Sequence, residues 1–485
     1  MNVVLFNPRA QVSHRRLPLS LLCVARGLAE HAWTLVDGNV EPDAEARLRR
    51  LCAAPGTVLF VTVMPGPQLR VATPLCRALK RANPGLIVVW GGYFPSIHTA
   101  ACARDAGVDF VVVGQGERTA PELLDALARG RDATTVAGVG QWRDGALVQG
   151  PPRPVARSSD WGELPYERLD MERYAARTFL GRRTFNHHAS VGCPYRCNFC
   201  AVVNLFDGRW IPDPSESVVR TVTRLAREHR ADAIEFHDNN FFAWERRTRE
   251  VADGIAPLGV SWWGEGRIDT MLGFTDETWA AMARSGLRMV FFGAESADDA
   301  VLERMDKGGL RVADTVALNL RARRWGIRPE FSFVLGNPGD PEGDAARSLA
   351  LARRLKDDNP DCEIILYLYT PVPLPGMYDA AVAEGFAFPD TLDGWLGPEW
   401  GAYAQRRDPR TPWMLDRIRR SIHDFESVLH ARHPSASDLN LRPWQRAVLR
   451  VLAEPRWRLG IYRAPWELRA LQRVWRYRRP EEMGF

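Results

Sequence analysis

Three cysteines that lie close together in the chain have the types and spacing best suited to chemistry. Cys193, Cys197 and Cys200 occur within residues 192–200 with the spacing C-x3-C-x2-C. Thiolates on one tight loop can wrap a corner of a 4Fe–4S cubane. Three ligands leave the fourth iron open, and an open metal position can bind a further ligand directly. The spacing therefore predicts a cluster with one vacant corner.

Two other interpretations of these cysteines stay open, a structural zinc site and incidental thiols. Structural zinc needs four closed ligands, usually as two pairs. His187 and His188 lie nearby, but successive residues of the preceding strand point to opposite faces, so the two imidazoles should not converge. The remaining cysteines are isolated among apolar residues and are predicted to be small core side chains. They are Cys23, Cys52, Cys76, Cys102 and Cys362.

The cysteine loop follows the first strand of an alternating series of strands and helices. The candidate strands are apolar runs at residues 185–191, 233–236, 260–263, 289–293, 330–335 and 363–369. Six β/α units over residues 184–385 predict a partial version of the eightfold barrel. Such barrels place their chemistry on the loops that follow the strands.

The cysteine spacing, with the aromatic Phe199 just before the third cysteine, resembles the hallmark of the radical SAM superfamily. The resemblance implies that Cys193, Cys197 and Cys200 ligate a 4Fe–4S cluster whose open iron binds S-adenosyl-L-methionine. It also implies an electron donor such as flavodoxin or ferredoxin. The reduced cluster would cleave adenosylmethionine to a 5′-deoxyadenosyl radical, which abstracts a hydrogen atom. The cofactors carry this chemistry, while the protein positions and shields them.

Segments after the later strands resemble family motifs in the same order. They are residues 236–241, 264–269, 293–296 (G-A-E-S), 336–340 and 373–378. Asn337 stands where the family usually has Leu, and Met377 where it has Thr. Taken singly, each segment could be an ordinary turn or helix cap. The cofactor-binding residues implied here are Phe199, Asp238, Asn239, Glu265, Arg267, Glu295 and Ser296.

Residues 1–135 show a second alternating series, in which continuous apolar runs end in glycine-rich turns. This pattern predicts a Rossmann-like α/β domain with a parallel sheet covered on both faces, which binds ligands beyond the carboxyl ends of its strands. The turns at 62–68, 90–96 and 113–117 resemble those of the cobalamin-binding domain found in one radical SAM subclass. The cobalamin-binding residues implied are Met64, Gly66, Gln68, Gly91, Gly92, Phe94, Ser96, Gly114, Gly116 and Glu117.

The N-terminal domain departs from the cobalamin pattern in several places. Asp37-Gly38-Asn39 occupies the place of the D-x-H-x-x-G motif, so the usual cobalt-ligating histidine is missing. Phe94 stands for the usual His, Pro65 for Thr and Gln115 for Glu. A Rossmann-like domain that has lost its ligand, or binds another nucleotide, is the alternative. A dinucleotide site is disfavoured because no G-x-G-x-x-G opens the first helix.

The other regions carry weaker signals. Residues 136–183 are proline-containing and aperiodic, and are predicted to be a linker with short β pieces. Residues 386–485 are predicted to be helical, and 401–485 hold 18 Arg and no Lys, against 9 Asp plus Glu, with five interleaved tryptophans. Such a region could bind nucleic acid, an anionic membrane surface or an acidic substrate. The favoured interpretation is that the tryptophans cover the barrel mouth while the arginines lie in water.

Composition limits the class of protein. The 485 residues are 46% hydrophobic and 25% charged, as in an ordinary globular protein of two or three domains. The net charge of +5 does not argue for nucleic acid. We expect a cytoplasmic protein, because neither a spanning helix nor a signal-peptide pattern is evident.

Three functional hypotheses follow. The first is a cobalamin-dependent radical SAM methyltransferase that acts on an unactivated carbon of a small molecule, with a lipid-like, tetrapyrrole or natural-product substrate. The second is a cyclase, oxidase or ring-rearranging enzyme with the same cofactors and no methyl transfer. The third is a non-catalytic cobalamin or nucleotide sensor, against which the intact three-cysteine loop argues. The sequence assigns no catalytic residue.

Overall fold

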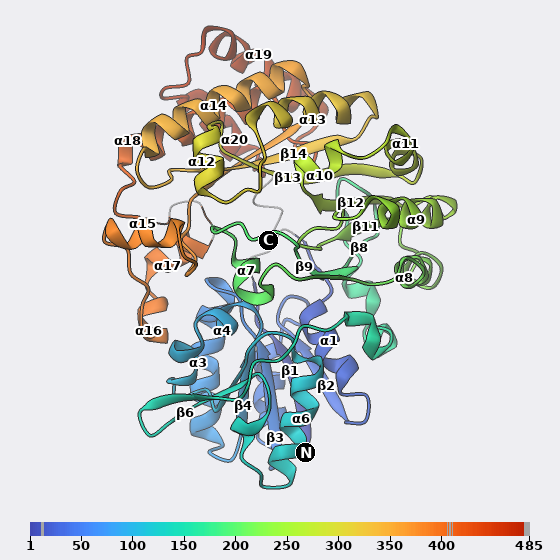
Figure 1. The fold of residues 1–485 in the computed structure, drawn as a ribbon, viewed down its shortest axis with the longest axis vertical. Coiled ribbons are helices and arrows are strands. Elements are labelled where there is room, and N and C mark those ends of the chain that lie inside the picture. The colour runs from blue at the N-terminus through green and yellow to red at the C-terminus, as the bar shows by residue number, and fades with distance from the viewer. Residues whose placement is uncertain (11–13, 405, 407–408, 410, 480–485) are drawn as a thin grey trace.

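Two large sheets, one mostly parallel and one fully parallel, lie one beyond the other along the long axis of the molecule (Figure 1). The computed structural model describes residues 1–10, 14–404, 406, 409 and 411–479. The sheet near the N-terminus has seven strands, and the second parallel sheet has six. Helices cover both, which confirms the α/β fold class predicted from the alternating patterns.

The N-terminal sheet has the order β2-β1-β3-β4-β5-β6-β7, and its first five strands are parallel. Its β-branched and aromatic residues are buried on both faces because helices pack on each side. The parallel strands are β1 (Asn2–Asn7), β2 (Trp33–Asp37), β3 (Thr57–Thr62), β4 (Ile87–Gly91) and β5 (Phe110–Val112). The helices are α1 (Leu19–Gly27), α2 (Ala44–Cys52), α3 (Pro67–Ala82), α4 (Tyr93–Ile97), α5 (Thr99–Ala103) and α6 (Gly116–Ala128).

An antiparallel hairpin extends this sheet into the segment predicted as a linker. It consists of β6 (Val139–Arg143) and β7 (Ala146–Gln149), and β6 pairs with β5. The turn between them has positive φ at both Asp144 and Gly145. Two left-handed residues match the right-handed twist of a hairpin, and Asp-Gly is a favoured pair for this turn. The dipeptide was therefore a hairpin signal within the predicted linker.

The second sheet has the order β15-β14-β13-β12-β11-β8 with all neighbours parallel. Its strands are β8 (Thr184–His187), β11 (Ala233–Phe236), β12 (Ser261–Gly266), β13 (Leu287–Glu295), β14 (Arg328–Leu335) and β15 (Glu363–Leu368). The main covering helices are α8 (Ser215–Glu228), α9 (Glu245–Ile255), α11 (Asp276–Arg284), α13 (Val312–Arg324) and α14 (Pro341–Asp358). This is the predicted six-unit partial barrel.

Alternate residues of these strands lie in different surroundings. Trp262 is fully buried, and its ring N–H donates to Ser285 Oγ just after α11, so it faces the helices. The next residue, Trp263, keeps accessible surface on the inner side, as do Glu265 and Phe291. The inner side of the sheet is therefore reached by solvent while the helix side is closed.

The strand predicted at 185–191 is two strands. β8 ends at His187, and β9 (Ser190–Gly192) pairs instead with β10 (Trp210–Pro212) in a separate antiparallel sheet. The break places the cysteine loop on its own small hairpin, with α7 (Ala201–Phe206) after it.

The remaining helices lie within the barrel series and in the last part of the chain. They are α10 (Ile268–Leu272), α12 (Asp299–Arg304), α15 (Met377–Ala383), α16 (Leu392–Trp395), α17 (Pro398–Ala404), α18 (Asp416–Arg432), α19 (Pro443–Leu459) and α20 (Trp466–Val474), the first two lying within the barrel series. α18 packs on α14, and α19 packs on α18 at the end of the molecule opposite the N-terminal sheet (Figure 1). Across the described ranges, every helix is too short or too polar to cross a bilayer.

The tryptophans of this region do not together cover the mouth of the barrel. Trp413 is buried, and its ring N–H donates to Gly336 O at 2.8 Å, next to the end of β14. Trp457 is buried among the terminal helices, whereas Trp444 and Trp466 are exposed. Only Trp413 fits the favoured interpretation, because the terminal helices stack behind α14 rather than over the strand ends.

Candidate functional site

The three cysteines lie on the loop between β9 and α7. Cys197 is buried, while Cys193 and Cys200 are partly accessible. Gly192 begins the loop with φ +77, and a Cβ there would come within 2.1 Å of the Arg209 carbonyl. Glycine is therefore needed where the chain turns out of the strand.

Donors surround the thiols. Arg267 Nη1 lies 3.5 Å from Cys197 Sγ, and Asn240 Nδ2 lies 3.9 Å from Cys193 Sγ. Burial raises the pKa of the Cys200 thiol to about 11, and it raises that of Cys193 as well. The neighbouring Cys197 thiol adds to the rise in pKa at both Cys193 and Cys200. Cys193 and Cys200 therefore need a bound cation to become thiolates at neutral pH, and the donors around the loop are placed to stabilise that charge.

The arrangement fits a cluster better than a single metal ion. Among the described residues, no three His, Cys, Asp or Glu side chains converge closely enough to hold one ion. A zinc ion would need every sulfur within about 2.3 Å of one point. A cubane binds each sulfur to a different iron, so its cysteines stand further apart. The loop spacing, the donors and the buried unpaired Asn240 Oδ1 are compatible with that larger group.

Arg267 sits at the end of β12 and links the loop to the sheet. Its side chain pairs with Asp269 at 2.8 Å and lies 3.8 Å from the centre of the Tyr195 ring. Tyr195 belongs to the cysteine loop, and its hydroxyl bonds Thr270 Oγ1 at 2.7 Å. The predicted residue Arg267 therefore lies at the site, held from two sides.

Glu295 also lies at the site, through a partner that the sequence did not indicate. Lys307 Nζ donates to Glu295 Oε1 at 2.5 Å and lies 5.4 Å from the centre of the Phe199 ring. Burial would lower the pKa of Lys307, but the Glu295 carboxylate and Cys197 outweigh it and keep the ammonium charged. Glu295 has φ +63 at a register shift of β13. A non-glycine residue there costs about 1–3 kcal/mol, and such strain clusters at functional positions.

Three other predicted residues lie away from the thiols or face elsewhere. Asp238 is buried and accepts hydrogen bonds from Ala189 N and Ser190 Oγ, so it ties β11 to the break between β8 and β9. Asn239 is exposed, and it is the next residue, Asn240, that faces Cys193. Ser296 is buried and donates to Asp344 at 2.5 Å, which fastens the end of β13 to α14.

Glycines with positive φ follow three adjacent strands of the N-terminal sheet. They are Gly66 after β3, Gly92 after β4 and Gly114 after β5, with φ of +78, +94 and +77. Nothing lies within 4 Å of the position that a Cβ on Gly114 would take, and Met64 nearby in the first turn is 48% exposed. The turn at Gly114 leaves an open backbone surface, as a large flat ligand requires, whereas a Cβ on Gly66 would lie 2.7 Å from Ala404 Cβ and one on Gly92 would lie 2.9 Å from Thr62 Oγ1. This edge therefore fits cobalamin.

Several predicted cobalamin contacts instead hold the turns in place. Gln68 is buried and donates to Asn7 Oδ1 and Pro8 O, joining the ends of β1 and β3. Ser96 Oγ accepts from Gly114 N at 3.0 Å and donates to Gly92 O at 2.7 Å. Gly91 ends β4.

Residues at the start of α6 face α1. A Cβ on Gly116 would come within 2.8 Å of Val24. Glu117 is buried, lies 3.8 Å from Arg26 and accepts from Ser158 Oγ. Both residues therefore contribute to helix packing.

Phe94 does not face the open edge. Its ring is fully buried and packs edge-on against Trp395, with ring centres 5.0 Å apart. His98 packs on the same tryptophan. The substitution of Phe for the family's His thus serves a contact with the C-terminal region.

The two candidate sites meet. Helix α4, which follows Gly92, contacts α7, which follows Cys200. Tyr93 lies at this junction, where burial raises its pKa to about 12 and the Cys200 thiol and Arg406 are near enough to act on it. The glycine edge of one domain therefore borders the cysteine loop of the other.

Carboxylates line the inner side of the second sheet near this junction. Glu235 lies within 3.4 Å of His14, Arg16 and His237, and the Arg16 charge together with the hydrogen bonds of the two imidazoles holds the pKa of Glu235 well below its ordinary value despite burial. Burial and neighbouring acids raise the pKa of Glu265 to about 8 and that of Glu330 to about 8. Of these only Glu265 was predicted as a site residue. The signal in the sequence that could have indicated the other two was glutamate at the strand positions that face the inner side of the sheet.

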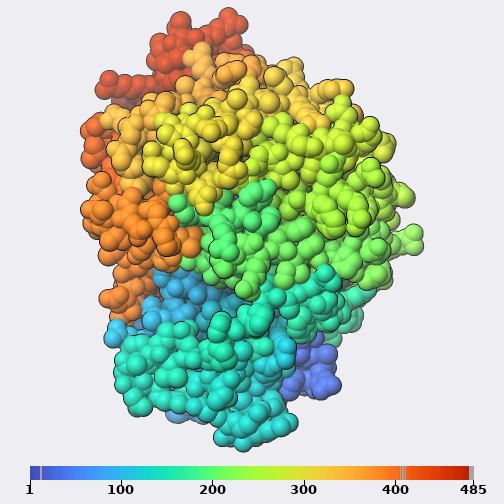
Figure 2. All heavy atoms as spheres, viewed as in Figure 1, coloured from blue at the N-terminus to red at the C-terminus, as the bar shows by residue number. Residues whose placement is uncertain are grey.

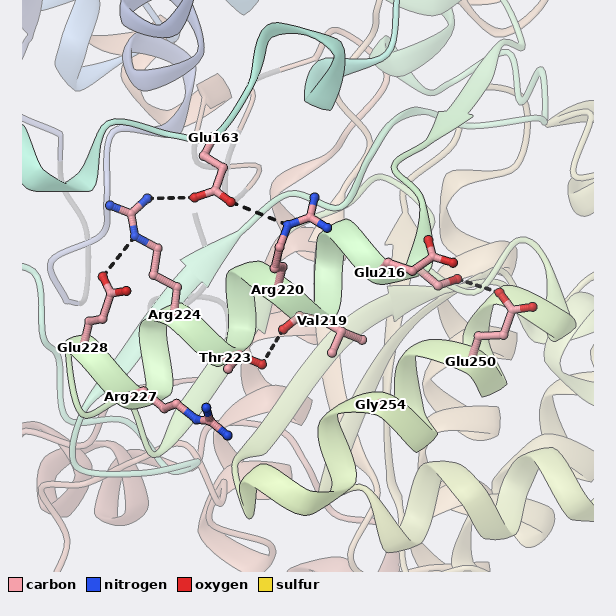
Figure 3. Close-up of a pocket in the computed structure, with 11 residues that line it drawn as sticks. Glu163, Glu216, Val219, Arg220, Thr223, Arg224, Arg227, Glu228, Glu250 and Gly254 are labelled. Carbon is pink, nitrogen blue, oxygen red and sulfur yellow. Dashed lines mark hydrogen bonds and ion pairs between the residues drawn. The ribbon is translucent and has the colours of Figure 1, made fainter.

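A groove of about 690 Å³ lies on the outer helices, away from the strand ends (Figure 3). Glu163 reaches across it to Arg220 and Arg224, at 3.6 and 3.2 Å. The charged side chains that line the groove are largely paired with one another, on α8 and neighbouring elements, so we do not assign a ligand to the groove.

Comparison with known proteins finds two family models that match this chain. The model of the B12 binding domain matches residues 9–124, and that of the radical SAM superfamily matches residues 189–352. An uncharacterised methyltransferase of Pyrococcus horikoshii is 26% identical over 79% of this chain and 84% of its own length.

Two other relatives match this chain over a smaller share of their own length. The anaerobic magnesium-protoporphyrin IX monomethyl ester cyclase of Synechocystis sp. is 25% identical over 66% of each chain. The hopanoid C-3 methylase of Methylococcus capsulatus is 27% identical over 68% of this chain and 62% of its own.

Solved structures share the fold. The methyltransferase TsrM of Kitasatospora setae, with cobalamin and a 4Fe–4S cluster bound, superposes with a TM-score of 0.67 at 18% identity over 98% of both chains. The cobalamin-dependent enzyme OxsB gives a TM-score of 0.70 at 16% identity over 95% of this chain and 71% of its own. With the cysteine loop and the glycine edge both in place, the chain is a radical SAM enzyme that carries a B12-binding domain.

Proposed function

We propose that this enzyme is a cobalamin-dependent radical SAM methyltransferase acting on an unactivated carbon of a small molecule. The observation that carries the proposal is the junction of α4 with α7, which brings the glycine edge next to the cysteine loop. A substrate at this junction would be within reach of both cofactors. Proximity of this kind is what a reaction between two bound groups requires.

Two groups of residues at that junction would hold the cofactors. Cys193, Cys197 and Cys200 would ligate the 4Fe–4S cluster, with Arg267 and Lys307 balancing its charge. The turns at Gly66, Gly92 and Gly114 would carry cobalamin. When bound, the cluster with adenosylmethionine supplies a 5′-deoxyadenosyl radical, and methylcobalamin supplies the methyl group.

The protein's own groups shape the substrate side. Glu265 and Glu330 face the inner side of the sheet and hold protons near neutral pH, so they can donate hydrogen bonds as well as accept them. The partial barrel shields this side with Trp263 and Phe291. We propose a largely apolar substrate with a few polar groups, of the lipid-like, tetrapyrrole or natural-product type. Relatives named for a hopanoid and for a magnesium-protoporphyrin ester support that range.

The test is an oxygen-free assay of the reconstituted protein with adenosylmethionine carrying a deuterated methyl group. An extract from a strain lacking the gene would serve as the substrate source. Methyl transfer requires that 5′-deoxyadenosine and S-adenosylhomocysteine both form and that one metabolite gains the labelled methyl. Protein with Cys197→Ala is the matched control and should give none of these products.

The similarity to a cyclase supports a second candidate, a cyclisation or oxidation without methyl transfer. In that case 5′-deoxyadenosine forms with a modified metabolite, while neither S-adenosylhomocysteine nor labelled product appears. If cobalamin and the cluster are both bound yet no deoxyadenosine forms under dithionite, both enzymatic proposals are wrong.

A further inference from the structure

Helix α19 has two apolar faces. Leu449, Ala453 and Trp457 are buried against the rest of the molecule, as expected for a packed helix. A second set of apolar residues recurs at helical spacing and is exposed, and we call it the outer face. Its members are Trp444, Val448, Val451, Leu452, Pro455 and Leu459.

The outer face is unusual for a surface helix. The positions i, i+4, i+7, i+8, i+11 and i+15 fall on one stripe of about 100°. It lies roughly opposite the buried stripe, because residues 449, 453 and 457 are about half a turn away. Val451 is 71% exposed, Leu459 72% and Trp444 55%. Packing against the part of the chain that the structure describes therefore does not account for these apolar residues.

Neighbouring exposed residues enlarge the patch. Ile461 and Trp466 follow the end of α19, and Trp466 is 74% exposed. The Trp444 ring packs edge-on against Trp475, with centres 5.5 Å apart, which brings the end of α20 and its exposed Val474 beside the start of α19. Contiguous exposed apolar surface of this kind marks an interaction site. It lies at the end of the molecule farthest from the N-terminal sheet (Figures 1 and 2).

The charge around the patch selects an anionic partner. Residues 440–479 contain eleven Arg and two Glu. Both acids are already paired, Glu454 with Arg432 and Arg458, and Glu467 with Arg456. Five arginines form no ion pair with any described residue. They are Arg442, Arg450, Arg463, Arg473 and Arg476.

We propose that the outer face of α19, with the exposed residues of α20, docks the enzyme on an anionic lipid bilayer. Exposed Trp, Leu and Val on a helix rich in Arg are the composition of helices that lie in the membrane interface. Trp prefers the headgroup level, and each arginine near an anionic surface adds attraction. The proposal goes beyond the methyl transfer and does not depend on it.

Sedimentation of the full chain with sucrose-loaded vesicles tests this proposal. The vesicles are phosphatidylcholine alone, and phosphatidylcholine mixed with phosphatidylglycerol. We expect partitioning at least tenfold stronger to the mixed vesicles, falling as salt is added. The combined variant Trp444→Ser, Val451→Ser and Leu459→Ser should bind the mixed vesicles at least tenfold more weakly than the wild type does. Replacing Arg450, Arg463 and Arg473 by Gln should cost about fivefold for each arginine removed.

The chain offers a matched control for the apolar variant. Trp244, Val382 and Leu320 are exposed to 48%, 48% and 49% and lie on other elements. The variant Trp244→Ser, Val382→Ser and Leu320→Ser removes the same side chains and should leave vesicle binding unchanged. Thermal unfolding of both triple variants checks that neither change disrupts the fold.

Three outcomes would overturn the proposal. They are equal partitioning to both kinds of vesicle, absence of sedimentation with either kind, and an outer-face variant that binds as well as the wild type. Light scattering distinguishes a second copy of the chain as the occupant. A wild-type dimer that the outer-face variant dissociates, together with no vesicle binding, would assign the patch to self-association.

Discussion

At the scale of single residues, burial and charge decide what each candidate group can do. Cys200 and Cys193 have pKa values above the usual range because they are desolvated, so they need a bound cation to ionise. Arg267, from the end of β12, and Lys307, from the segment after α12, interact with the third thiol, Cys197. Asp238 and Ser296, which belong to the same series of strand-end motifs, instead make structural hydrogen bonds. Motif membership alone therefore does not define the role of a residue.

The first prediction concerns the thiols. Cys193→Ala, Cys197→Ala and Cys200→Ala should each reduce iron, sulfide and the visible chromophore to near background in oxygen-free preparations, because a cubane held by two thiolates is labile. Cys23→Ala, which removes an isolated thiol on α1, should retain all three signals. Stoichiometric zinc in the wild type, or an intact chromophore in Cys197→Ala, would contradict the cluster assignment.

The second prediction concerns the pH dependence of stability. Burial, aided by the Glu363 charge, raises the pKa of Glu330 from 4.5 to about 8. Between these values the folded state holds a proton that the unfolded state releases, so this group makes stability fall as pH rises from about 4.5 to about 8. Glu330→Gln should remove that slope and raise the free energy of unfolding by about 1–3 kcal/mol at pH 8, with little change at pH 4.5.

Urea unfolding at several pH values measures this effect. Glu277→Gln, at an exposed position of α11, is the control and should not alter the slope. A wild-type stability that rises across the interval, with Glu330→Gln parallel to it, would show that Glu330 is ionised in the fold.

At the scale of elements, turns at strand ends determine where ligands can approach. A turn with a positive-φ glycine follows each of β3, β4 and β5, and the parallel order of these strands puts the three turns side by side. The break between β8 and β9 does the same for the cysteine loop, because it releases that loop from the main sheet. Each cofactor site therefore depends on where a strand stops.

The third prediction belongs to this scale. Gly114→Ala should lower the cobalamin bound after reconstitution at least tenfold, because its Cβ would project into the open edge where the macrocycle approaches. The φ of +77 should cost only about 1–2 kcal/mol of stability. Gly130, beyond the far end of α6, has φ +62 and equally open space around it. Gly130→Ala should therefore show the same loss of stability but bind as much cobalamin as the wild type. Visible absorbance and thermal unfolding separate the two effects.

At the scale of the whole molecule, the C-terminal region joins parts that are distant in sequence. Arg77 of α3 pairs with Asp393 at 2.7 Å, and Arg70 donates to Gly397 O at 3.2 Å. Between them Trp395 packs on Phe94. On the other side, Asn186 of β8 exchanges hydrogen bonds with the backbone of Leu17. These contacts keep the glycine edge and the cysteine loop facing each other.

The fourth prediction tests this connection. Trp395→Ala should destabilise the protein by about 3–5 kcal/mol, because a buried aromatic ring is lost. It should also speed proteolysis within residues 386–404 by loosening α16 from the N-terminal domain. Trp244→Ala, at an exposed site, should change stability by less than about 0.5 kcal/mol. Equal proteolysis of the two variants would mean that Trp395 does not join the domains.

The sequence alone determined the local features of this protein. The C-x3-C-x2-C spacing, the apolar runs of β1, β3, β11 and β14, and the glycines after the strands all depend on neighbouring residues. Local periodicity and turn chemistry are readable without a fold. The Asp144-Gly145 hairpin was equally local, and its signal lay inside the predicted linker.

Only the tertiary structure decided which side chains meet. Lys307 reaches Glu295 and the cysteine loop from a segment without any motif. Phe94 lies under Trp395 instead of at the glycine edge, and Asn240 rather than Asn239 faces Cys193. These outcomes depend on packing between elements far apart in the chain, which no local spacing encodes. The physical reason is that a side chain's partner is set by where the strands and helices converge in space.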